Sequence, residues 1–186
     1  MDFRYTVRRA NQEDCGAILN MLKEQASQEG GAFTELTNTE KGLRDDGFGS
    51  DHIFYHSLII EASEEGGDET SPKVDVVGLA MYHFAYTVWK GRVIFLNDVY
   101  IQQAHRGRGL GKVLMCEVAK IAAGMNCIGM QWLVEGTNEN ARQFYDYLGA
   151  ADVTATDGMS FVCLRGDSFA NLAKYQPRPE SNIHFL

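Results

Sequence analysis

The chain has 186 residues, a hydrophobic content of 45% and a formal net charge of −8. This length supports one well-buried core and is short for two, so we expect one domain over residues 1–174 and a C-terminal tail over residues 175–186. The acidic balance argues against a nucleic-acid-binding surface, because such a surface needs basic side chains to neutralise phosphates. Small cationic partners fit better, although many proteins are acidic without binding any.

The cysteines and the N-terminus indicate an intracellular protein. Cys15, Cys116, Cys127 and Cys163 form no Cys-x-x-Cys pair and have no histidine at zinc-ligand spacing, so we expect reduced, mostly buried thiols. The first residues, MDFRYTVRRANQED, lack the apolar core of a secretory signal. No run approaches the roughly 18 apolar residues that span a bilayer, so we expect a cytoplasmic protein without membrane contact.

The first third of the chain predicts a strand and two helices. FRYTVRR, residues 3–9, alternates apolar and polar residues as a half-buried strand does. Asn11 can cap a helix whose apolar side carries Cys15, Ile18, Leu19, Leu22 and Ala26. Thr37 and Glu40 have the spacing of a capping box, which predicts a second short helix that ends near residues 45–49.

The middle of the chain predicts an antiparallel meander. Residues 52–62 and 74–88 are rich in β-branched and aromatic residues, and the acidic segment 63–73 between them has the composition of a solvated loop. WKGR, residues 89–92, is typical of a hairpin connection into the next strand, VIFLNDVYI.

The last third predicts helices and strands in alternation. After HRGRGLG, residues 105–111, the apolar residues change to helical spacing, at Leu110, Leu114, Met115, Val118 and Ile121. Residues 127–136 are typical of a strand, and Asn138 can cap a helix that runs through Tyr147 and stops at Gly149. ADVTAT and MSFVCLR predict two more strands before a short helix over residues 167–174.

Residues 106–111 form an R-G-x-G-x-G sequence between a strand and a helix. A dinucleotide fingerprint that starts at Gly107 would require glycine in place of Lys112, and a Walker A loop would require Ser or Thr in place of Val113. What remains is a loop whose backbone N–H groups converge on an anion at a helix N-terminus, as in a pyrophosphate site. The alternative is a glycine-rich turn with solubilising charges.

With its flanking segments, this motif resembles the GCN5-related N-acetyltransferase (GNAT) superfamily, in which Q/R-x-x-G-x-G/A holds the pyrophosphate of acetyl-CoA. Arg106, Gly109 and Gly111 occupy the motif positions. Further segments resemble the spermidine/spermine (diamine) acetyltransferases, including their thialysine branch, over roughly residues 4–174: LTNTEKGLRDDGFG, VGLAMYHFAYTVWKG, FLNDVYI and WLVEGTNENARQFYDYLGA.

The resemblance implies a mixed α/β fold with a central, mostly antiparallel sheet, a splayed parallel strand pair and flanking helices. Residues 1–174 would form one N-acetyltransferase domain. The implied reaction is direct transfer of acetyl from acetyl-CoA to a primary amine of a small molecule, within a ternary complex and without a metal. Family members are homodimers, so a homodimer is expected here.

The resemblance also assigns residues to acetyl-CoA. Backbone groups of Val99, Tyr100 and Ile101 would bind the pantetheine arm, and Asn138 would contact the cofactor. Tyr145 stands where the family places the acid that protonates the departing thiolate, a role that suits a phenol because its ordinary pKa of about 10 exceeds a thiol's of about 8.5. The pyrophosphate loop would comprise Arg106, Gly107, Arg108, Gly109, Leu110, Gly111 and Lys112.

The amine side departs from the family pattern. Asn97 replaces the glutamate that acts as base through a water molecule, and an amide cannot accept that proton. Asp98 is retained, but neighbouring strand residues face opposite sides unless a bulge redirects one of them. Thr87 stands where polyamine enzymes carry an aspartate, which weakens the case for long polyamines, so a polyamine, a diamine and a smaller, thialysine-like amine all stay open. The other expected substrate-binding residues are Glu29, Glu35, Trp89, Gln131, Trp132 and Leu133.

Two other functions fit the same residues. A protein or peptide lysine acetyltransferase would also be served by an acidic face. A catalytically weak acetyl-CoA-binding protein is the second alternative, because Asn97 cannot act as a base.

Overall fold

The computed structural model describes residues 3–29, 36–49, 52–64, 74–158, 162 and 164–174. These residues belong to two compact units, Met1–Leu133 and Val134–Leu186, which are described in turn. No helix within the described ranges is both long enough and apolar enough to cross a membrane.

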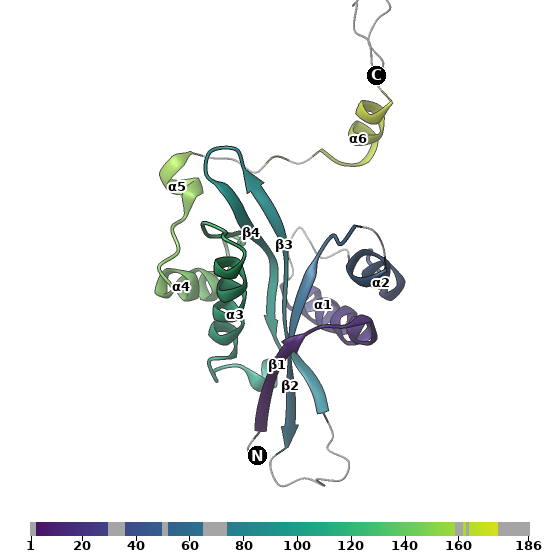
Figure 1. Cartoon of the computed structure of the whole chain (residues 1–186), viewed down its shortest axis with the longest axis vertical. Helices are drawn as coiled ribbons and strands as arrows, with labels where there is room; N and C mark the ends of the chain where they lie inside the picture. Colours follow the sequence, from purple (N-terminus) through teal and green to yellow (C-terminus); the bar gives the residue numbers. More distant parts are fainter. Residues whose placement is uncertain are drawn as a thin grey trace, which may run out of the picture. The chain divides into compact units, whose positions relative to one another are not determined.

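The first unit is built on a sheet of five strands in the order β1-β2-β3-β4-β5 (Figure 1). The strands are β1 (Phe3–Arg9), β2 (His56–Glu64), β3 (Val74–Thr87), β4 (Gly91–Ile101) and β5 (Met130–Trp132). The first four pair antiparallel along the chain, whereas β5 pairs parallel with β4. This mixed sheet confirms the predicted fold class, including its parallel pair.

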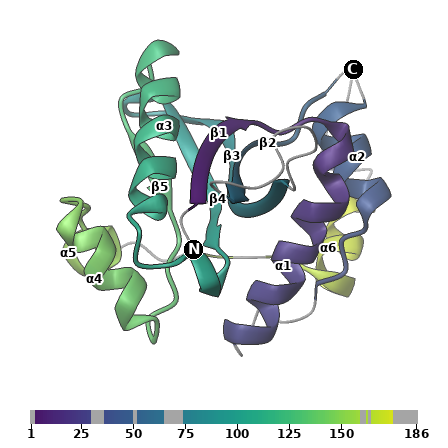
Figure 2. The same ribbon diagram turned by 90° about the horizontal axis from the view of Figure 1, so that it is seen from below.

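Helices cover both faces of this sheet. The helices α1 (Cys15–Glu29) and α2 (Glu40–Phe48) lie on one face, and α3 (Leu110–Gly124) lies on the other (Figure 2). The α1/α2 face is closed by a core that includes Ile18, Met21, Ile59, Leu79 and Tyr100. On the α3 side, the helix buries the predicted Leu110, Leu114, Met115 and Val118.

One of the two helix caps predicted in the first third of the chain is confirmed, and the other is shifted. Asn11 caps as predicted, within a capping box that opens the short η1 (Gln12–Asp14) and leads into α1. The predicted cap of α2 was wrong by two residues, because Thr39 and not Thr37 precedes the helix. The Thr39 side chain accepts a hydrogen bond from the Gly42 N–H, and its extended backbone suits a cap.

The second unit contains α4 (Glu139–Tyr147), α5 (Val153–Asp157) and α6 (Gly166–Ala173). Asn138 caps α4 as predicted, and Gly149, with a φ of +83°, follows its end. The strand predicted at residues 151–156 is wrong. The Asp152 side chain accepts hydrogen bonds from the N–H groups of Thr154 and Ala155, which starts α5 there instead.

Several expectations fall outside the described residues: most of the strand predicted at 159–165, Cys163 and the tail from 175. Of the other cysteines, all free thiols, Cys15 is buried and Cys127 is partly buried, but Cys116 is exposed. The prediction of buried thiols was therefore wrong for Cys116. It lies on the solvent side of α3, between the buried Met115 and Val118.

Candidate acetyl-CoA and amine site

The parallel strands β4 and β5 pair over only three residues of β4, from Ile94 to Leu96. β4 then continues for five residues beyond this pairing, to Ile101. This stretch contains Val99, Tyr100 and Ile101, whose backbone groups were expected to bind the pantetheine arm. Among the described residues no strand pairs with that edge, and apart from the Ile101 carbonyl, which accepts a hydrogen bond from Arg106, its backbone groups can bind an extended ligand.

A β-bulge lies where the two strands part. Met81 of β3 pairs with Asp98 and Tyr82 pairs with Leu96, which makes Asn97 the extra residue. The bulge comes directly after Leu96, the last residue of β4 that pairs with β5. A bulge at this point can redirect the side chain of Asn97 or Asp98. Strand periodicity alone does not reveal it.

The bulge brings polar side chains of β3 and β4 together on the α1/α2 face. Asn97, which is exposed, accepts a hydrogen bond through Oδ1 from Nδ1 of His83, at 2.8 Å. Asp98, which is partly buried, accepts one through Oδ1 from Nε2 of Gln25 on α1, at 2.9 Å. Asn97 and Asp98 were predicted from the sequence, whereas His83 and Gln25 were not. Counting residue pairs across the 89–92 hairpin would have placed His83 opposite Phe95, near Asn97.

The glycine-rich loop leads directly into α3. Gly107 and Gly109 have φ values of +76° and +77°, a left-handed conformation that disfavours other residues. A Cβ built on either glycine meets no atom within 4 Å, so both face open space. Gly109 is the N-cap of α3 and supplies no side-chain hydrogen bond to it.

The first amides of α3 are therefore available to an anion. The first helical bond runs from Val113 N–H to the Gly109 carbonyl, at 3.1 Å. The N–H groups of Leu110 and Gly111, at the start of the helix, have no acceptor within it. Together with the helix dipole, they fit a phosphate group.

Arg106, at the start of this loop, donates hydrogen bonds to β4 and to α1. Its Nε donates to the Ile101 carbonyl and its Nη2 donates to Oε1 of Gln28, both at 2.8 Å. The guanidinium carbon also lies 5.3 Å from the centre of the Tyr100 ring. Arg106 thus ties the end of β4 to α1. Arg108 is exposed and lies 5.9 Å from the Phe3 ring centre.

The expected substrate-binding residues are spread over the first unit. Trp132 pairs with Leu96 beside the bulge, between an exposed Gln131 and Leu133. Thr87 ends β3 at the hairpin, and Trp89 at its tip is 90% exposed. At about 3.3 Å per strand residue, the hairpin lies roughly 20 Å from Asn97. Nothing is described of the Glu29 side chain, which ends α1, or of Glu35.

Two further candidates belong to the second unit. Asn138 Oδ1 accepts from Ala141 N–H, at 3.1 Å, which is the capping role. Tyr145 is partly buried on α4, with its ring centre 5.5 Å from that of Phe144.

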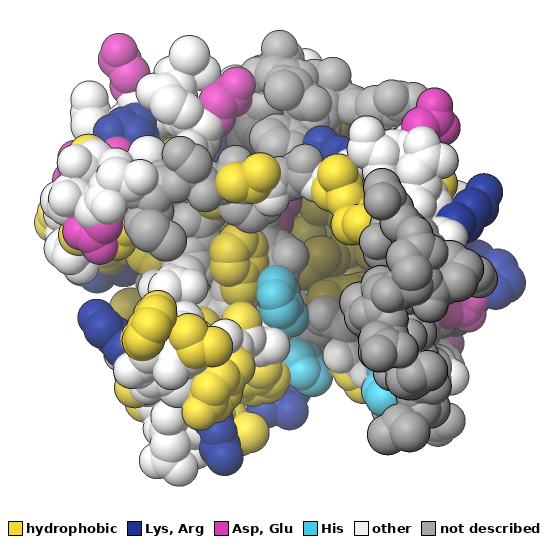
Figure 3. Space-filling model, turned by 90° about the horizontal axis from the view of Figure 1, so that it is seen from above, with side chains coloured by type: hydrophobic (Ala, Val, Ile, Leu, Met, Phe, Trp, Pro, Cys, Tyr) yellow, Lys and Arg dark blue, Asp and Glu magenta, His cyan; other side chains and the backbone are white. Residues whose placement is uncertain are grey.

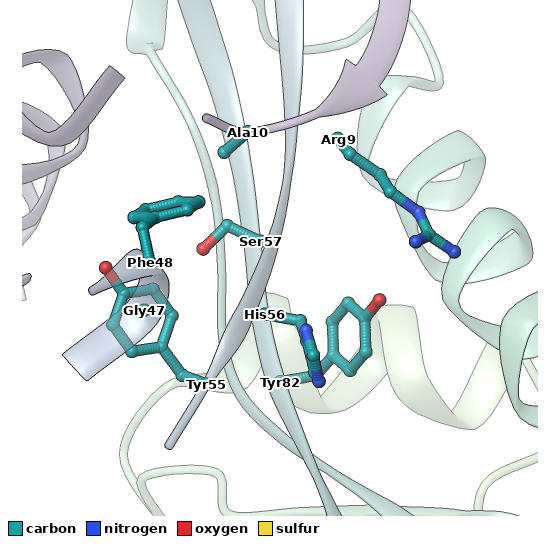
Figure 4. Close-up of a pocket in the computed structure, with 8 residues that line it drawn as sticks. All are labelled: Arg9, Ala10, Gly47, Phe48, Tyr55, His56, Ser57 and Tyr82. Atoms are coloured by element: carbon teal, nitrogen blue, oxygen red, sulfur yellow. The ribbon is translucent and has the colours of Figure 1, made fainter. Parts of the chain in front are cut away.

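A small pocket lies elsewhere on the first unit (Figure 4). Gly47 admits the Tyr55 ring there, because an added Cβ would come within 2.6 Å of it. Burial lowers the pKa of His56 in this pocket. None of the predicted site residues lines it; the lining residues are Arg9, Ala10, Gly47, Phe48, Tyr55, His56, Ser57 and Tyr82.

Comparisons with known proteins agree with this geometry. The chain is 35% identical over 167 residues to the thialysine N-epsilon-acetyltransferase of Bos taurus, covering 90% of this chain and 96% of that protein. It is 35% identical over 173 residues to the human spermidine/spermine N(1)-acetyltransferase-like protein 1, covering 93% of this chain and 24% of that protein.

A solved structure shows the same fold. An aminoglycoside N-acetyltransferase in complex with CoA superposes with a TM-score of 0.64 at 17% identity, covering 90% of this chain and 97% of that one. The family model for the acetyltransferase (GNAT) family matches residues 33–150. The chain belongs to the GNAT family of acetyltransferases.

Proposed function

We propose that this protein transfers acetyl from acetyl-CoA to a primary amine of a small molecule. The observation that carries the proposal is the glycine loop, with its left-handed Gly107 and Gly109 and uncapped amides at the start of α3, beside the unpaired end of β4. The related fold solved with CoA supports the same cofactor.

In this proposal each segment of the first unit has one task. The amides of α3 hold the pyrophosphate, and the free edge of β4 at Val99, Tyr100 and Ile101 binds the pantetheine arm. Acetyl-CoA supplies the acyl group as a reactive thioester. Tyr145 of the second unit donates a proton to the departing sulfur, as the family resemblance implies.

The amine is proposed to be small, with few distal charges. Polyamines carry several ammonium groups, and each needs an acidic partner to be held firmly. Here Thr87 and Asn97 are uncharged where the family resemblance expects carboxylates. The thialysine enzymes among the relatives support a substrate of that kind, with one reactive amine.

An amine panel tests this function. Wild-type protein is incubated with acetyl-CoA and, separately, thialysine, lysine, ornithine, putrescine, spermidine, spermine and a lysine peptide, and CoA release is measured. We expect the highest kcat/KM for thialysine or a similar small amine. Preference for the peptide would select a peptide acetyltransferase. Acetyl-CoA binding without turnover on any amine would select a binding protein.

A homodimer is part of the proposal. The β3–β4 hairpin exposes large apolar side chains, with Tyr86 73%, Val88 80% and Trp89 90% accessible. Figure 3 shows hydrophobic side chains exposed on the face seen from above. A second copy would cover such a surface and would bring the hairpin to a site it does not reach within one chain. Light scattering at micromolar concentration should give the dimer mass, and a monomer mass would overturn the assembly.

A further inference from the structure

The reaction needs a proton acceptor that the family position does not provide. A primary ammonium has a pKa of about 10.4, so near neutral pH it must lose a proton before it can attack a thioester. Asn97 occupies the position of the expected base, and its amide cannot take that proton. The carboxylate of the neighbouring residue, Asp98, already accepts a hydrogen bond from Gln25.

His83 can accept a proton, and it lies on the same face of the sheet as Asn97 and Asp98. It pairs with Phe95 and lies two residues from Met81, whose side chain packs against the α1/α2 core. Since side chains alternate along a strand, His83 and Met81 face the same side. Asp98, which pairs with Met81 and contacts α1, faces it too. The bulge adds Asn97 to the group.

The hydrogen bond to Asn97 determines which ring nitrogen of His83 is free to act. An amide oxygen only accepts, so the 2.8 Å contact with Oδ1 places the hydrogen on Nδ1. Nε2 then keeps its lone pair. His83 is partly buried and its ring stacks at a tilt on Phe95, with centres 5.3 Å apart, so the ring is held in place from two sides.

We propose that His83 is the general base, with Nε2 accepting the proton from the amine and Asn97 as the residue that fixes its tautomer. This deepens the proposed function and rests on it. The N–C bond forms as the C–S bond breaks. Of the two protons that leave the nitrogen, the first passes through Nε2 of His83 to solvent before the attack, and the second goes to solvent as the amide forms. Tyr145 gives its own proton to the departing sulfur and takes one back from solvent.

Acidic and basic groups both lie on the α1/α2 side of the sheet. Among the described residues, the ionisable groups on the α1/α2 side include Asp98 and Tyr100 on β4, Glu24 on α1, Tyr55 before β2, and Arg106, whose guanidinium lies over the Tyr100 ring.

The test compares His83→Gln with His52→Gln, a control that removes an exposed histidine outside the sheet. His83→Gln should lower kcat at pH 7 by about 10²- to 10⁴-fold, the usual contribution of a general base, without changing acetyl-CoA affinity. Its rate should then follow the free amine, rising about tenfold per pH unit toward the amine pKa of about 10.4. The control should keep the wild-type rate and profile.

Rescue separates a chemical role from a structural one. In the double variant His83→Gln with Asn97→Glu, a carboxylate at 97 can act as base through water, so at least a tenfold recovery of kcat is expected. A merely structural histidine would give no such recovery. Wild-type kcat and pH profile in His83→Gln would overturn the role of His83 while leaving the proposed function intact, whereas failure of the wild-type protein on every amine would overturn both.

A spectroscopic measurement tests the tautomer independently of activity. Long-range ¹H–¹⁵N correlation spectra of the wild-type protein above pH 8 should show the His83 hydrogen on Nδ1. In Asn97→Ala this preference should weaken. A hydrogen on Nε2 in the wild-type protein would contradict the proposal even if no variant folded.

Discussion

At the scale of single residues, the site depends on which groups can give or take a proton. The Asn97 amide cannot take a proton from the amine, but its oxygen accepts a hydrogen bond from His83, the base that we propose. The departure from the family pattern at 97 thus has a partner at 83, on the neighbouring strand. A site in which the base has moved is a sufficient explanation, and a disabled site is not required.

Tyr145→Phe tests the acid. This variant keeps the ring and removes only the donor, so kcat should fall by about 10²-fold or more while acetyl-CoA binding stays nearly unchanged. Steady-state kinetics and calorimetry measure the two quantities. Tyr147→Phe, on the same helix but 71% exposed, is the matched control. Equal kcat in the two variants would remove Tyr145 from the mechanism.

Asp14→Asn tests an ion pair that holds β1 to the start of α1. Asp14 is buried and accepts two bonds from Arg8, at 2.7 and 2.8 Å, and one from the Asn11 N–H, at 2.7 Å. Its pKa is lowered chiefly by the bonds from Arg8, although burial opposes this. The variant should lose about 1.5–3 kcal/mol of unfolding free energy at pH 7, as expected for a hydrogen bond to a charged group.

The sign of the pH dependence follows from the lowered pKa. The carboxylate stabilises the fold above its ordinary pKa of about 3.9, and this contribution is lost as pH falls through the lower value in the folded state. Urea unfolding should therefore show the gap between wild type and variant narrowing below about pH 4. Asp45→Asn, which breaks an exposed pair with Lys41, should change little. A gap that grew on acidification would refute this account.

At the scale of elements, the proposed phosphate site depends on the junction between the glycine-rich loop and α3. Gly109→Ala forces a side chain into a φ of +77°, at a cost of about 1–2 kcal/mol, and turns the adjoining amides away from their convergent direction. Acetyl-CoA affinity, measured by calorimetry, should fall at least tenfold. Gly91→Ala carries the same kind of strain, at a φ of +97°, at the opposite end of β4.

These two glycine variants differ only in where the strain lies. Gly91→Ala should be destabilised but should keep its affinity for acetyl-CoA. If both variants bound acetyl-CoA as wild type does, the loop would not be the pyrophosphate site.

Elements were predictable where one signal dominated. The alternation in β1 and the helical spacing of α3 are repeated over many residues, so both were found from the sequence. The segment at 151–156 is short, and its β-branched Val153 and Thr154 are typical of a strand. The Asp152 carboxylate nevertheless accepts hydrogen bonds from two backbone N–H groups and starts a helix there. The bulge at Asn97 could not be predicted from the alternation of residues along β4, because it depends on how β3 pairs with β4.

At the scale of the whole molecule, the sequence carries more local information about the proposed cofactor loop than about the proposed amine site. The loop is local, since its glycines and the following helix lie within a few residues. The amine site depends on contacts between residues far apart in the chain, such as His83 with Asn97 and Gln25 with Asp98. The expected role of Glu29 and Glu35 in the choice of amine stays a prediction, because no local pattern determines their register.

The most direct test of the central claim follows the acetyl group itself. Wild-type protein is mixed with thialysine and acetyl-CoA labelled with ¹³C in the acetyl group, and the products are identified by NMR and mass spectrometry. The account predicts that the label appears on the side-chain nitrogen of thialysine, in a yield equal to the CoA released. Label found only in free acetate, or CoA release that does not depend on the amine, would contradict it.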